Sequence, residues 1–232
     1  MKTANIFKTI FLIILISPFT LNAYSQQSGS SVEYIAYGLR FGIGASKFKG
    51  LEDYRYLGRL PGTDIPAQDY SSTFRLAFDA GVSAQIMFYN KLLIQGDLYF
   101  SYAGAGLKGA NAITYDDRRN TRISAYYTVL SIHVGRKMPV NDKFRFIVGA
   151  GPYGGLESTS WLYDEDAHTP EEDLSIGYGD FKKYDFGLSL MGGVEVGNVQ
   201  FTIDYNHGLV NIVNDDYPLY NRVIKLSTIY FF

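Results

Sequence analysis

The sequence predicts an all-β fold: an eight-stranded antiparallel up-and-down transmembrane β-barrel preceded by a signal peptide. Three observations predict it. Apolar side chains recur at every second position along eight segments, the connections between these segments alternate between short and long, and the chain has 24 glycines, 20 tyrosines and 16 phenylalanines but no cysteine. Only every second residue of a membrane-spanning strand faces lipid, so such chains combine many aromatic residues with weak overall hydropathy.

Residues 1–25 have the order of a secretory signal peptide. Lys2 and Lys8 lie near the start, an apolar run covers residues 10–16, and a small-residue pattern at 23–25 predicts cleavage before Gln26. The run is shorter than the roughly 20 residues that a membrane-spanning helix needs. Cleavage changes the formal net charge from -2 to -4 and leaves residues 26–232 as one barrel domain, with no basic excess for nucleic acid.

The eight strands follow from alternation, because successive strand side chains point to opposite faces. The clearest case covers residues 73–88, where every even-numbered position from Phe74 to Phe88 is apolar and the odd positions include Arg75, Asp79 and Gln85. A helix would distribute both sets around its circumference. The other strands are expected to include residues 39–43, 92–102, 126–134, 144–150, 186–196, 199–205 and 224–232.

The connections sort into two kinds. Residues 89–91, 138–143 and 197–198 are expected to be tight turns, in which Asn or Gly supplies the required backbone conformation. Residues 46–71, 105–123, 157–184 and 207–221 are expected to be long polar loops. Short turns on one rim and long loops on the other are typical of an outer-membrane barrel with both termini in the periplasm.

Outward aromatic residues near the strand ends predict two interfacial girdles, because aromatic rings prefer that depth of a membrane. The periplasmic girdle is expected to contain Phe88, Tyr89, Phe144, Tyr230 and Phe232, and the outer one Phe74, Tyr102, Tyr126, Phe186 and Tyr205.

Four stretches resemble the PorT-type or porin-family outer-membrane β-barrel domain common in Bacteroidota. They are FDAGVSAQIMFYNKLLIQGDLYFSYAGAGLKG, FRFIVGAGPYGGL, YDFGLSLMGGVEVGNVQFTIDYNHGLVNI and NRVIKLSTIYFF. The resemblance consists of strand patterning and glycine placement, so it implies a fold and a place in the outer membrane but no catalytic residue or cofactor. The last strand also resembles the C-terminal signal recognised by the barrel-assembly machinery, at Ile224, Leu226, Thr228, Tyr230 and Phe232.

An eight-stranded barrel has an interior just wide enough for its own side chains. Charged residues at inward positions are expected to pair there as a polar network, since buried charges are tolerated when they are paired and hydrogen-bonded. Arg145 with Glu195 and Asp97 with His133 are expected to be partners, and an ion or proton path along the network is the alternative use. The predicted network is Arg40, Arg75, Asp79, Asp97, His133, Arg145, Asp185, Glu195, Asp204 and Lys225.

Three functions stay open. The leading one is a non-enzymatic barrel, plugged by its polar interior, whose long loops bind something outside the cell or stabilise the envelope. The second is a narrow channel for ions or small solutes. The third is an outer-membrane hydrolase in which Asp204 and His207 form a base and its orienting partner, although no nucleophile motif accompanies them.

The expected partners are outer-membrane lipid and lipopolysaccharide, the barrel-assembly machinery during insertion, and an unidentified extracellular or envelope ligand. No cofactor or metal motif is present in the sequence. Carboxylates of the third long loop form either a solvated surface or a site for divalent cations that bridge to lipopolysaccharide: Asp164, Glu165, Asp166, Glu171, Glu172 and Asp173.

Overall fold

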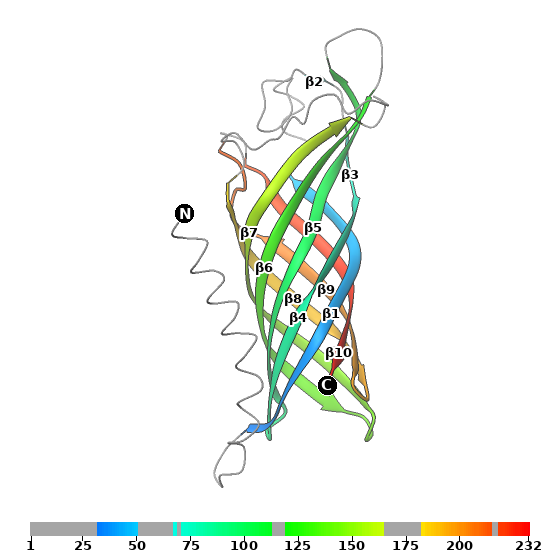
Figure 1. Cartoon of the computed structure of the whole chain (residues 1–232), viewed down its shortest axis with the longest axis vertical. Helices are drawn as coiled ribbons and strands as arrows, with labels where there is room; N and C mark the ends of the chain where they lie inside the picture. The colour runs from blue at the N-terminus through cyan, green and yellow to red at the C-terminus, as the bar shows by residue number, and fades with distance from the viewer. Residues whose placement is uncertain (1–31, 51–66, 69–70, 113–118, 165–181, 215–217) are drawn as a thin grey trace.

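A closed antiparallel barrel forms the body of the protein (Figure 1). The computed structural model describes residues 32–50, 67–68, 71–112, 119–164, 182–214 and 218–232, so the predicted signal peptide lies outside the described residues. Eight long strands make the wall: β1 (Val32–Lys49), β4 (Arg75–Phe88), β5 (Leu92–Ala112), β6 (Arg119–Pro139), β7 (Phe144–Asp164), β8 (Tyr184–Val196), β9 (Val199–Gly208) and β10 (Tyr220–Phe231). Consecutive strands pair, and β1 pairs with β10 to close the sheet, which confirms the predicted fold.

Two short strands, β2 (Ala67–Gln68) and β3 (Ser71–Thr73), pair with the far end of β5. Within the described residues, no helix is long and apolar enough to cross a membrane.

Alternation along each strand determines which side chains face out. In β8, for example, exposed and buried residues alternate from Tyr184 to Met191. The outward set is apolar, with exposed fractions of 60% for Phe41, 59% for Ile203 and 54% for Leu226. The inward set contains most of the buried charged residues. This distribution is the reverse of that in a soluble protein and is typical of a wall surrounded by lipid.

The three predicted tight turns lie at one rim, which we call the short-turn rim, although residues 138 and 139 of the middle one belong to β6. They connect β4 to β5, β6 to β7 and β8 to β9. Lys91 and Gly197 adopt positive φ angles of 66° and 59° in the first and last of these turns. In the middle turn, Asn141 Oδ1 accepts hydrogen bonds from the backbone N–H groups of Lys143 and Phe144.

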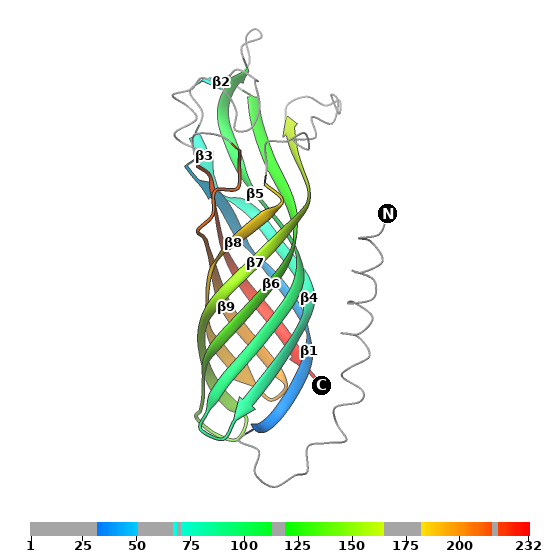
Figure 2. The ribbon, with the colours of Figure 1, turned by 90° about the vertical axis from the view of Figure 1, so that its left-hand side faces the viewer.

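The opposite rim, which we call the long-loop rim, differs from the prediction because several strands continue beyond it. β5, β6 and β7 each have 21 residues and project past the other strands (Figures 1 and 2). Residues 105–112, 119–123 and 157–164, expected in loops, are therefore strand, as are residues 46–49 of β1. The ladder between β5 and β6 continues to the pair of Leu107 and Thr121, so backbone pairing extends these strands where side-chain alternation is weak.

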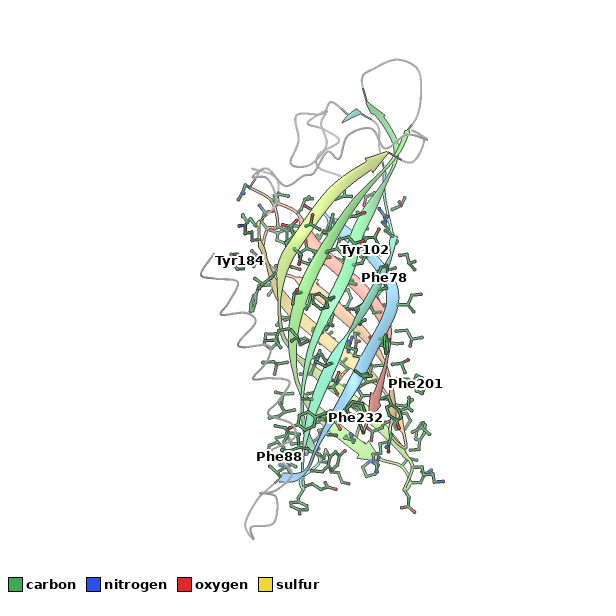
Figure 3. All side chains as sticks on the ribbon, viewed as in Figure 1. Phe78, Phe88, Tyr102, Tyr184, Phe201 and Phe232 are labelled. Carbon is green, nitrogen blue, oxygen red and sulfur yellow. The ribbon has the colours of Figure 1, made fainter. Side chains whose placement is uncertain are left out.

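Outward aromatic side chains lie near both ends of the barrel. Tyr230 and Phe232 are 52% and 72% exposed near the short-turn rim, and Phe74 and Phe186 are 67% and 49% exposed near the other. Figure 3 shows Phe88, Phe201 and Phe232 toward the short-turn rim and Phe78, Tyr102 and Tyr184 toward the long-loop rim. Tyr102 stacks between Phe78 and Tyr126, at centroid distances of 4.8 and 5.0 Å.

Candidate functional site: the barrel interior

Arg40 is the centre of the polar interior. It comes from β1, where the even-numbered residues from Gly38 to Phe48 face inward, and it is 1% exposed. Its guanidinium meets three carboxylates from three other strands: Nε lies 3.3 Å from Asp79 Oδ1, Nη1 3.5 Å from Asp97 Oδ2 and Nη2 2.5 Å from Asp204 Oδ2. The planar guanidinium with its five donors suits such a many-sided contact.

Lys225 and Ser227 of β10 complete this group, which we call the Arg40 cluster. Lys225 Nζ lies 2.5 Å from Asp79 Oδ2, and Ser227 Oγ accepts a 2.7 Å hydrogen bond from Arg40 while donating to Asp204. The ring of Tyr99 covers both cations, at 4.9 Å from Arg40 Cζ and 4.2 Å from Lys225 Nζ. Both cations thus have carboxylate and aromatic partners although the cluster is buried.

A second row of polar contacts leads from Asp97 around the wall. Ser83 Oγ donates to Asp97 at 2.5 Å, and His133 Nδ1 lies 3.5 Å from Asp97 Oδ2. His133 Nε2 lies 2.8 Å from Ser189 Oγ, and Ser189 donates to Asn206 Oδ1 at 2.8 Å. Strands β4, β5, β6, β8 and β9 are joined in this way.

Hydrogen bonds cross the full diameter of the barrel at two levels. β5 and β9 are four places apart among the eight strands of the closed sheet, so they face each other across the interior. Gln200 Nε2 of β9 donates to Gln95 Oε1 of β5 at 3.1 Å, and Asn206 Nδ2 donates to Tyr99 Oη at 3.2 Å. Gln85 also donates to both glutamines, at 3.3 and 3.2 Å. The lumen at these levels is occupied by side chains from opposite walls.

A separate group of charges lies at the short-turn rim, and we call it the Lys137 cluster. Lys137 is 1% exposed, and its Nζ lies 2.6 Å from Glu195 Oε2, 2.6 Å from Gln85 Oε1 and 2.8 Å from Tyr34 Oη. Arg145 Nη1 holds the other carboxylate oxygen of Glu195 at 2.8 Å and has a side chain 32% exposed. Gln85 connects this cluster to the glutamines above it.

An open pocket of about 160 Å³ adjoins the Lys137 cluster. Its lining includes Tyr34, Gln85, Arg145, Glu195 and the terminal residue Phe232. Water therefore reaches the edge of this cluster, whereas the Arg40 cluster is enclosed.

Asp185 lies toward the long-loop end of the interior. Asp185 is 2% exposed and accepts hydrogen bonds from Tyr153 at 3.0 Å and Asn221 at 3.1 Å. A hydrogen bond from Leu209 N to Phe186 O of β8, at 2.9 Å, attaches the segment after β9 to the wall. Within this end of the barrel, Ile212 N donates to Leu219 O and Lys182 N donates to Ile212 O, at 2.9 and 2.8 Å. Four apolar side chains in this region are fully buried: Phe48, Ile212, Val213 and Leu219.

The structure brings most of the predicted network together but changes some of its partners. Arg145 and Glu195 are direct cross-strand neighbours. His133 is opposite Gln95 rather than Asp97, so its contact with Asp97 is diagonal. Arg75 lies apart from the Arg40 cluster, half-buried toward the long-loop rim, with its guanidinium 5.4 Å from the Tyr102 ring. Asp185 has neutral hydrogen-bond partners in place of the expected cation.

Several interior residues were missed by the sequence reasoning. Lys137 is the clearest: it continues the inward series of Ser131 and His133 on β6, but the predicted turn begins directly after it. Extending the alternation by two steps, past Gly135, would have found it. Tyr99, Gln200 and Ser227 carry no charge, so nothing in their pattern marked Tyr99 and Ser227 as contacts of Arg40, or Gln200 as a partner of Gln95.

The Asp204–His207 pair of the hydrolase hypothesis is not formed. Asp204 is buried and faces inward, whereas His207 lies at an outward position of the same strand. His207 Nδ1 instead lies 3.3 Å from Tyr205 Oη. The barrel wall thus separates the acid from the base. Among the described side chains, no group of three or more His, Asp or Glu residues is arranged to hold a metal ion.

Comparison with known proteins places the fold. A family model described as the outer membrane protein beta-barrel domain matches residues 24–214, most of the chain. The chain is similar in structure to Ail, the attachment invasion locus protein of Yersinia pestis (13% identity, 85% of this chain and 98% of that chain covered, TM-score 0.38). It is also similar to Neisserial surface protein A (13% identity, 86% of this chain and 100% of that chain covered, TM-score 0.41). A third similar structure is OprG from Pseudomonas aeruginosa (12% identity, 85% of this chain and 94% of that chain covered, TM-score 0.39). No curated protein sequence matches the chain.

Proposed function

Since the chain belongs to the outer membrane protein beta-barrel domain family, and thus to the bacterial outer membrane, we propose that it is a non-enzymatic, non-conducting barrel. Its interior acts as a fixed plug, and its long loops bind an extracellular or envelope ligand or stabilise the envelope. The finer family placement, a PorT-type protein of Bacteroidota, belongs to the same proposal and rests on the strand sequences quoted above.

The observation that carries the proposal is the pair of contacts across the diameter. A solute path along the axis would have to pass the contact of Gln95 with Gln200 and that of Tyr99 with Asn206. Between them lies the Arg40 cluster, in which Arg40 and Lys225 are held by three carboxylates. Separating these charges without supplying water to each costs several kcal/mol, so thermal motion opens the path rarely.

The non-enzymatic part is supported by the separation of Asp204 from His207 across the wall. A catalytic base and its orienting acid must lie within hydrogen-bond distance of each other.

The proposed orientation places the short turns and both termini in the periplasm and the long loops outside, after removal of residues 1–25. Outer-membrane barrels have short turns on the periplasmic side and longer loops on the extracellular side, which supports this orientation. β10 presents one outward face: Ile224, Leu226 and Tyr230 face outward, Thr228 continues the same face, and Phe232 lies beside it at the short-turn rim. That face is the proposed recognition signal for the barrel-assembly machinery.

Solute flux and surface labelling test the proposal together. Liposomes that contain the folded protein should swell in arabinose or glycine no faster than empty liposomes, while a general porin in parallel liposomes gives rapid swelling. In whole cells, a single cysteine at Asp116 in the second long loop should react with a membrane-impermeant maleimide, and one at Asn198 in a short turn should not. Swelling would favour the narrow-channel alternative, and labelling at Asn198 alone would reverse the orientation.

A further inference from the structure

Basic side chains gather on the outward face of the barrel at the long-loop end of β1, β9 and β10. Lys47 of β1 is the direct cross-strand neighbour of Arg222 on β10, and Arg222 is the direct neighbour of His207 on β9. Lys49 lies two residues beyond Lys47 on the same face. We call Lys47, Lys49, Arg222 and His207 the basic patch.

The basic patch borders the outward apolar surface. On the same outward face, the level two residues closer to the short-turn rim contains Ile224 of β10, which is 47% exposed. The level after that contains Ile43 of β1 and Ile203 of β9, which are 56% and 59% exposed. Aromatic rings lie at the height of the patch itself. Lys47 Nζ is 6.0 Å from the centroid of the Phe74 ring, and Arg222 Cζ is 5.8 Å from that of Tyr220. Cations at this depth lie at the level of lipid headgroups.

Two cations placed directly opposite each other across a strand pair repel and destabilise the pair. Arg222 is nevertheless held in place, because its Nη1 donates to Gly208 O at 2.6 Å and to Asn221 O at 2.8 Å. Among the described residues, neither Lys49 nor Arg222 forms an ion pair with an acidic side chain. A group of cationic side chains beside an apolar surface suits a ligand that has phosphate at one end and acyl chains at the other.

We propose that the basic patch binds the phosphate of a lipid A-type glycolipid in the outer leaflet, with its acyl chains along Ile43, Ile203 and Ile224. Lys47 and Lys49 supply charge, and Arg222 supplies a positioned donor. The identity of the leaflet rests on the orientation given under Proposed function. The apolar surface directly below the cations favours a phosphorylated lipid over free phosphate.

Native mass spectrometry of the full folded protein in detergent micelles tests this inference. The protein is titrated with bisphosphorylated lipid A and, separately, with fully dephosphorylated lipid A. The test variant is Lys47→Gln with Lys49→Gln, which leaves the backbone contacts of Arg222 intact. The matched control is Lys91→Gln with Lys143→Gln, which removes two exposed lysines at the short-turn rim. Heat-dependent gel mobility verifies that each variant is folded.

Wild type and the control should bind the bisphosphorylated lipid at least tenfold more tightly than the dephosphorylated one. K47Q/K49Q should lose about tenfold or more of that affinity, since each near-surface lysine contributes roughly a fivefold factor. If the double variant does not fold, K49Q alone should lose about fivefold. The inference is overturned if the patch variant keeps its preference, if the control loses as much, or if equimolar inorganic phosphate displaces the lipid. None of these outcomes depends on conductance or loop labelling, so failure here is distinct from failure of the proposed function.

Discussion

The Arg40 cluster and the Lys137 cluster use the same kinds of side chains in different surroundings. Arg40 is 1% exposed, and its three carboxylate partners are at most 3% exposed. Lys137 is equally buried, but its partner Glu195 is shared with Arg145, whose side chain is 32% exposed beside the open pocket. Breaking an ion pair that water can reach costs little free energy, because water solvates the separated charges. Removing one partner of an ion pair that is sealed from water leaves an uncompensated buried charge. We therefore expect the cost of substitution to fall from the centre of the barrel to its short-turn rim.

Arg40→Met should have the largest effect. It leaves Asp79, Asp97 and Asp204 with Lys225 as the remaining cation of the cluster, and removing one partner of a buried ion pair costs about 3–5 kcal/mol. Urea unfolding in detergent micelles, followed by heat-dependent gel mobility and circular dichroism, measures the loss. Arg136→Met, at an exposed position near the short-turn rim, is the matched control and should change stability little. Equal losses in the two variants would contradict a central role for Arg40.

Lys137→Met should have the next largest effect. Three contacts to Nζ disappear, but Arg145 still holds Glu195 and water enters from the pocket. We expect a loss of about 1.5–3 kcal/mol, the range for hydrogen bonds to charged groups. The same urea titration measures it. A loss as large as that of Arg40→Met would show that the rim cluster is as well sealed as the centre.

Tyr99→Phe tests one of the contacts across the diameter while keeping the aromatic ring over Arg40 and Lys225. Only the hydroxyl that accepts from Asn206 is removed, so the free energy of unfolding should fall by about 0.5–1.5 kcal/mol. Tyr230→Phe, at an exposed outward position, is the control. No difference between the two variants would mean that the Tyr99–Asn206 contact contributes nothing to stability.

Arg145→Gln should have the smallest effect. The side chain is partly exposed, and Lys137 keeps its 2.6 Å contact with Glu195. We expect a loss of about 0.2–1 kcal/mol that shrinks further in high salt, as for other solvent-accessible ion pairs. Unfolding at low and high salt checks both parts, and a salt-independent loss above that range would place Arg145 among the buried charges.

The strands and turns of the barrel wall could be predicted from the sequence better than the side-chain contacts in its interior. Period-two alternation and turn residues indicate strands and short turns because both are local properties. The partners inside the barrel depend on the stagger between strands, which no local pattern contains. For this reason Arg145 and Glu195, which lie on adjacent strands and each stand close to a short turn, were paired correctly. The diagonal contact of His133 and the reach of Arg40 to β9 could be seen only in the structure.

The length of the strands was also hard to predict. Residues 105–112 and 157–164 continue as strand beyond the long-loop rim, where apolar and polar side chains follow one another without a clear alternation. Backbone pairing keeps them extended: both stretches pair with β6, and the end of β5 also pairs with β2 and β3. Lys137 was missed although inward and outward side chains alternate regularly up to it on β6. The predicted turn begins at the next residue, so the strand was ended too early.

Single-channel recording of the purified, folded wild-type protein in planar lipid bilayers tests the closed interior most directly. With Gln95–Gln200 and Tyr99–Asn206 joined across the diameter, the current should stay at the baseline of the bare bilayer at moderate voltage and neutral pH. Reproducible steps of uniform size from the pure protein would contradict the plugged barrel and favour a narrow channel.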